Sequence, residues 1–79
     1  MKVYCVSGDG EPPAYWGTVR EALKDARDRS KASDTEVTVE HCTLVPFTKD
    51  VILRVLNQGG GYVESSVTVL TFKDGREVK

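Results

Sequence analysis

Three side chains in this sequence have the chemistry to bind a soft metal ion or to act as a nucleophilic pair: Cys5, His41 and Cys42. A structural zinc site needs four ligands, usually in paired short spacings, and the chain contains no Cys-x-x-Cys pair. His41 and Cys42 are neighbours in a β-like segment, so their side chains point to opposite faces. A thiol nucleophile would require His41 beside Cys5, an orienting group and a cleft. We therefore expect no metal, no cofactor and no catalytic residue, with a small Cys–His enzyme as an alternative.

A glycine-containing loop offers a second candidate. Gly8-Asp9-Gly10 follows a predicted strand and precedes a helix, as a phosphate-binding turn does. It lacks a third glycine and a Lys-Ser/Thr pair, and two prolines separate it from the start of the helix. The pattern is typical of an ordinary turn.

Binding, rather than catalysis, is indicated by two aromatic residues at the end of this loop. Tyr15 and Trp16 belong to the residue types that dominate binding hot spots. Binding groups also concentrate on loops that a rigid scaffold holds. The alternative is that Trp16 folds over the open end of a small core and completes it.

A row of cations follows the aromatic pair. Arg20, Lys24, Arg27 and Lys31 recur at spacings of four, three and four residues, and so lie on one face of a helix. Interleaved acids weaken the field of this row, which also suits a solvated helix face. If the row binds a partner, an acidic protein is favoured over nucleic acid, because the chain has a net charge of −1.

Apolar periodicity and turn residues predict the elements that must position these groups. The pattern predicts an α+β fold of order β-α-β-α-β-β, a two-layer sandwich in which two helices pack on one face of a sheet of three or four strands. Asp74-Gly75 predicts a type I′ turn. The predicted strands cover residues 2–7, 35–45, 62–73 and 76–79, the predicted helices residues 18–31 and 48–57, and residues 7–17 are predicted to be irregular.

Local signals sharpen these elements. Thr18 and Glu21 fit a capping box at the start of the first helix. Beyond His41 the strand alternation changes phase, which indicates a bulge or entry into a buried part of the sheet. Phe47 is placed to pack on the first turn of the second helix, against Val51 or Ile52. That helix has an apolar arc too wide for one sheet contact, so either it is unusually buried or Leu53 contacts a second subunit.

Size and composition limit the function classes. The chain of 79 residues is expected to form a single domain over residues 1–79. Such a short domain has a thin core, which lowers the expectation of an enzyme. No apolar run approaches the roughly 20 residues of a membrane span. Because the first residues already form a strand and both cysteines lie in apolar runs, we expect a cytoplasmic protein with reduced, buried thiols.

The overall pattern resembles small accessory proteins of phages and prophages, including anti-CRISPR inhibitors of host defence. The resemblance rests on a strand from the first residue, on the helix entry YWGTVREALKDAR, and on the segment VPFTKDVILRVLNQGGGYV. It implies stoichiometric occupation of a host protein surface in the host cytoplasm, without chemistry, and it assigns no residue a role.

These observations lead to one hypothesis and three rivals. We expect a non-enzymatic inhibitor or adaptor that binds a host protein or protein complex, with Tyr15 and Trp16 as apolar anchors. Arg20, Lys24 and Arg27 are the expected polar contacts beside them. The rivals are a nucleic-acid-binding module that uses the same cations, a Cys–His enzyme, and a homodimer built through the second helix at Leu53.

Overall fold

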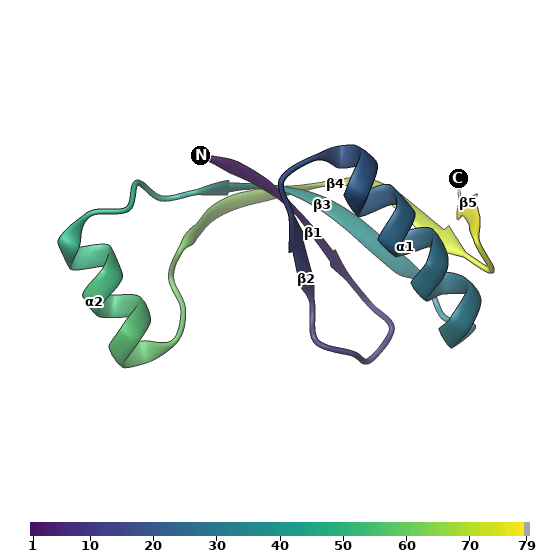
Figure 1. The fold of residues 1–79 in the computed structure, drawn as a ribbon, viewed down its shortest axis with the longest axis horizontal. Coiled ribbons are helices and arrows are strands. Elements are labelled where there is room, and N and C mark those ends of the chain that lie inside the picture. Colours follow the sequence, from purple (N-terminus) through teal and green to yellow (C-terminus); the bar gives the residue numbers. More distant parts are fainter. Residues whose placement is uncertain (79) are drawn as a thin grey trace.

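A computed structural model describes residues 1–78 of the chain, and these residues form two helices and an antiparallel sheet of five strands (Figure 1). The strand order in the sheet is β2-β1-β3-β4-β5. The α+β class predicted from the sequence is confirmed. The elements are β1 (Lys2–Ser7), β2 (Ala14–Trp16), α1 (Val19–Ser33), β3 (Val37–Leu44), α2 (Lys49–Gln58), β4 (Val63–Lys73) and β5 (Arg76–Val78).

Helix α1 begins where the capping residues predict. The Thr18 hydroxyl accepts a hydrogen bond from the Glu21 backbone N–H at 3.3 Å and donates one to the Glu21 carboxylate at 2.8 Å. The helix ends at Asp34, which adopts the left-handed conformation. Ala22, Ala26 and Ser30 are the buried residues of α1. Small side chains on this face let the helix lie close to the sheet.

The core lies between α1 and one face of the sheet. Val6 of β1 pairs with Val39 of β3, and Val37 of β3 pairs with Phe72 of β4. Side chains alternate along a strand, so these four point to the same face. They form one buried cluster with Ala22 and Ala26, and Tyr4, Trp16, Leu23 and Leu70 pack against it.

The turn between β4 and β5 is joined to α1 by a buried hydroxyl. Asp74 and Gly75 both have positive φ, as a type I′ turn requires, so this prediction is confirmed. The Gly75 N–H donates to the Ser30 hydroxyl at 2.8 Å, and that hydroxyl donates to the Arg27 carbonyl at 2.8 Å. Ser30 is fully buried. This link fixes the end of the sheet against the helix.

Two predictions about the architecture are wrong. The loop predicted for residues 7–17 contains strand β2, which pairs with Tyr4–Val6, so the sheet has five strands. Three residues paired at an edge are too few to produce a sequence signal. The second helix does not share the face that α1 covers. Helix α1 packs on β1, β3 and β4, whereas α2 has no comparable packing and lies beyond the end of the β3–β4 pair (Figure 1).

The projecting α2 makes the molecule long and narrow, with extents of 41 × 20 × 17 Å. The radius of gyration of 13.7 Å exceeds the roughly 11–12 Å expected for a compact chain of this length. We call this projecting end the tip. Among the described residues, no helix has the length and apolar character needed to cross a membrane.

The change of alternation predicted after His41 corresponds to register shifts between β3 and β4. The pairing shifts between Val39 and Glu40, and again between Thr43 and Leu44. Cys42 and Leu44 are buried on the face opposite α1, toward the tip. The sheet therefore has a second, smaller apolar region at this end, on its other face.

Removal of the Ser30 hydroxyl tests the link between α1 and the β4–β5 turn. We expect Ser30→Ala to lower the free energy of unfolding by about 1–3 kcal/mol, because the Gly75 N–H loses a buried acceptor. Urea denaturation followed by circular dichroism measures the change. Ser66→Ala, at an exposed position of β4, serves as the control. Equal stability of the two variants would contradict this role of Ser30.

Candidate protein-binding surfaces

An apolar groove occupies the tip, between α2 and the segments that connect it to the sheet. We call it the tip groove; it has a volume of about 160 Å³. Its rim carries Leu56, which at 75% exposure is the most exposed large hydrophobic residue within residues 1–78, and Phe47 is 56% exposed. The groove is lined by Phe47, Ile52, Val55, Leu56 and Tyr62.

The local sequence determines why α2 forms and where it ends. The Thr48 hydroxyl accepts from the Val51 N–H at 3.3 Å, and Gly59 takes the left-handed conformation with its N–H donating to the Val55 carbonyl at 2.8 Å. At the base of the tip, the Val45 N–H donates to the Tyr62 carbonyl at 2.9 Å. These bonds give the helix definite ends, although Val51 is its only buried residue.

The apolar residues of α2 occupy three kinds of position. Val51 is buried, and Ile52, Val55 and Leu56 line the groove together with Phe47. Phe47 was predicted to pack against Val51 or Ile52, and it shares the groove lining with Ile52. Leu53, the predicted dimer contact, is 46% exposed. The wide apolar arc seen in the sequence thus reflects exposure at the tip and not deeper burial.

Tyr15 joins this end of the molecule. Its ring lies edge-on to Tyr62, with 6.3 Å between ring centroids. Hydrogen bonding to Tyr62 raises the pKa of Tyr15, and partial burial raises it further. Tyr15 pairs with Cys5 across β1 and β2, so it lies on the face opposite α1. The first predicted anchor is therefore next to the tip groove and apart from the cations of α1.

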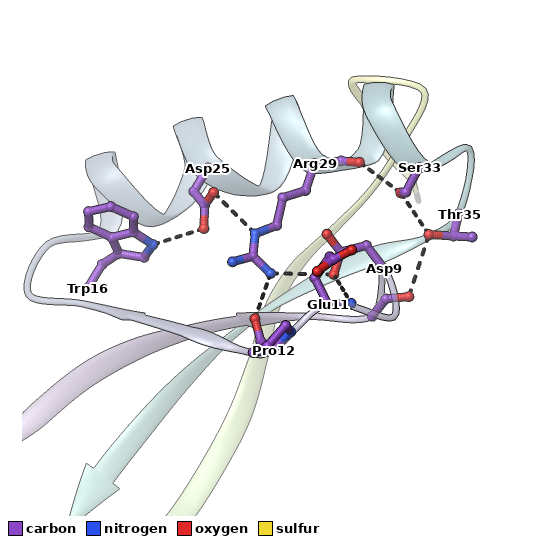
Figure 2. Close-up of polar contacts among 9 residues, drawn as sticks. Asp9, Glu11, Pro12, Trp16, Asp25, Arg29, Ser33 and Thr35 are labelled. Atoms are coloured by element: carbon purple, nitrogen blue, oxygen red, sulfur yellow. Dashed lines mark hydrogen bonds and ion pairs between the residues drawn. The ribbon is translucent and has the colours of Figure 1, made fainter.

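Trp16 has a different position. It pairs with Tyr4 and packs against the core beneath α1. Its indole Nε1 donates to an Asp25 carboxylate oxygen at 3.0 Å (Figure 2). Of the two sequence interpretations of Trp16, this position matches the one in which it completes the core. Because adjacent strand residues face opposite ways, Tyr15 and Trp16 do not form one patch.

Asp25 extends this contact into a polar network that holds the Gly8–Pro13 loop (Figure 2). The Asp25 carboxylate forms an ion pair with Arg29 at 3.2 Å. The Arg29 guanidinium also reaches the Asp9 carboxylate at 3.4 Å and donates to the Pro12 carbonyl at 3.1 Å. Asp9, in the glycine turn at residues 8–10, therefore takes part in a structural ion pair with Arg29. The sequence analysis missed this role of Arg29.

The cations predicted to contact a partner remain together on the exposed side of α1. Arg20, Lys24 and Arg27 line one shallow depression with Glu21 and Leu23. The Arg27 guanidinium lies 5.7 Å from the centroid of the Phe72 ring, a cation–π contact. Trp16 borders the neighbouring depression with Lys24. The cations of α1 therefore lie beside Trp16, whereas Tyr15 lies on the opposite face of the sheet.

The cysteines and the histidine are not brought together. His41 pairs with Tyr4 and stacks on its ring at 4.8 Å, on the α1 side of the sheet. Cys5 and Cys42 lie on the other face and are both buried free thiols. Burial is the largest cause that raises the pKa of each thiol. This arrangement disfavours a reactive thiolate.

Within residues 1–78, no group of three or more His, Cys, Asp or Glu side chains is placed to hold a metal ion.

Comparisons with protein-family models, with curated proteins and with solved structures find no match.

The raised pKa values of the thiols predict a loss of stability at alkaline pH. In the unfolded chain a thiol ionises near its ordinary value of 9.0, whereas in the folded chain Cys5 and Cys42 keep their protons to higher pH. Their contribution is fully present below pH 9 and is lost as the pH rises through the folded-state values. We expect the free energy of unfolding to fall as the pH rises above 9, until the folded-state thiols also lose their protons.

Urea denaturation across this pH range measures the effect. The double variant Cys5→Ala with Cys42→Ala is expected to flatten the dependence of stability on pH and also to lower the stability at pH 8.5, because two buried side chains are shortened. An unchanged slope in the double variant would show that other groups, such as Tyr15, cause the alkaline loss.

Proposed function

We propose that the chain is a non-catalytic protein-binding module, an inhibitor or adaptor, that acts by occupying the surface of a protein partner. The observation that carries the proposal is the apolar tip. Phe47, Ile52, Leu53 and Leu56 are each 46–75% exposed on one short projecting segment. Contiguous exposed apolar surface of this kind marks protein interaction sites.

Energetics support an interaction at the tip. A helix of ten residues is marginal in water when it stands alone, and α2 buries only Val51. A partner that covers the groove removes apolar surface from water at about 25 cal/mol per Å² and stabilises the helix at the same time. Covering the tip is therefore favourable both for its apolar side chains and for its helix.

The tip also suits a partner with an apolar side chain that projects. The groove is lined entirely by apolar and aromatic residues, and its volume is close to that of cavities that take up a benzene-sized group. Such grooves receive a leucine or an aromatic ring from an amphipathic helix.

A second contact surface is proposed at Arg20, Lys24 and Arg27, where an acidic protein would bind. The ion pairs of α1 within residues 1–78 involve Arg29, whereas Arg20, Lys24 and Arg27 are exposed. Their predicted role in binding a host protein, and an anti-defence function of the phage type, remain predictions. The same cations carry the rival proposal of nucleic-acid binding.

Affinity capture from a host lysate tests the tip as the binding surface. We expect the native chain to retain a protein in a fixed ratio and Leu56→Lys to lose it, with at least a tenfold weaker affinity (about 1.4 kcal/mol). Lysine keeps the helix propensity of the site and suits the last turn of a helix.

The matched control is Val67→Lys, because Val67 is 68% exposed and lies in β4, away from the groove lining. Circular dichroism verifies that both variants fold. Equal capture by the native chain and by both variants, or turnover of a substrate by the native chain, would contradict the proposal.

Charge reversal tests the α1 surface separately. We expect Arg20→Glu with Lys24→Glu to weaken binding of an acidic protein several-fold, mainly through slower association. Lys2→Glu with Lys73→Glu is the control for net charge, because both lysines are exposed outside α1. Salt titration identifies the kind of partner, since phosphate contacts give a steep loss of affinity with rising salt. Unaltered binding in the α1 double variant would exclude this surface.

A further inference from the structure

The tip groove and its rim are complementary to each other, and we infer that the partner of the tip is a second copy of this chain. This inference rests on the proposed function and names the occupant of the same surface. The two copies meet through α2 about a two-fold axis, and Leu56 of each copy enters the tip groove of the other.

The tip groove matches the size of the side chain that projects beside it. The groove has a volume of about 160 Å³, which accommodates one leucine-sized side chain. Leu56, on its rim, is 75% exposed and so is free to enter a neighbouring molecule. A projecting side chain beside a groove of its own size is what a self-complementary contact requires, because a two-fold axis presents the same patch from both sides.

The charged side chains of α2 lie outside the groove. A patch that meets its own copy must not carry a concentrated charge of one sign. At 100° per residue, Asp50 and Arg54 lie on the side of α2 away from Ile52 and Leu56. The Arg54 side chain lies against Gly61. The groove lining is uncharged. Lys49 lies on the same side of α2 as Ile52 and Leu56, but at the N-terminal end of the helix. If the two α2 helices run antiparallel about the two-fold axis, the two Lys49 side chains therefore stay apart.

The exposed apolar area of the tip determines how strong the dimer can be. Phe47, Ile52, Leu53 and Leu56 expose on the order of 400 Å², about half of what each partner buries in a standard stable interface. This area suits a weak, reversible dimer better than an obligate one. Tyr15 and Tyr62 beside the groove add surface that a two-fold contact would also cover.

Sedimentation equilibrium over a wide concentration range tests the inference on the native chain. We expect the average mass to rise from 8.7 kDa towards twice that value between about 10 µM and 1 mM. Leu56→Lys is expected to raise the dimer dissociation constant at least tenfold, and Val67→Lys is expected to leave it unchanged. In a dilution series by NMR, the amide shifts of residues 47–62 should move while those of α1 stay constant.

The outcomes separate this inference from the proposed function. A native chain that stays monomeric at 1 mM, while Leu56→Lys still abolishes lysate capture, overturns the second copy and leaves a foreign protein as the partner of the tip. A dimer that resists Leu56→Lys but dissociates in Val67→Lys places the contact at β4 and overturns the inference as well. If Leu56→Lys still captures the lysate protein and still dimerises, both proposals are overturned.

Discussion

A mismatch of length between α1 and the strands governs this structure. Helix α1 has 15 residues and is about 22 Å long, whereas β4 has 11 residues and spans about 36 Å. One helix therefore covers only part of the sheet. The buried contacts of Ala22, Ala26 and Ser30 define the covered half. The rest of the β3–β4 pair extends beyond the core and carries α2 outward as the tip.

The two halves consequently have different chemistry. In the covered half, Asp25 and Arg29 form an internal network that holds Trp16 and the Gly8–Pro13 loop in place. The uncovered half has no such network among the described residues, and several of its apolar side chains, among them Phe47, Ile52 and Leu56, are exposed. The internal polar network thus lies where α1 packs, and the exposed apolar side chains of α2 lie at the other end.

Sequence patterns predicted the elements better than their arrangement. Capping at Thr18, the turn at Asp74-Gly75 and the boundaries of β3 and α2 follow from local interactions, which a sequence displays directly. The placement of α2 depends on which apolar surface it meets, and its pattern fits burial and exposure equally well. The wide apolar arc was the available signal for the tip groove, but Phe47 and Tyr62 join it only through the fold. Trp16 and Tyr15 separate because a short strand, β2, sends neighbours to opposite faces.

The glycines that follow α2 and the scarcity of its buried residues have a consequence for how the molecule opens. Gly59 to Gly61 connect the helix to β4, and only Val51 anchors the helix itself. We therefore expect the tip to unfold locally, with amides that exchange at a lower free energy than those of β3, while the sheet and α1 stay folded.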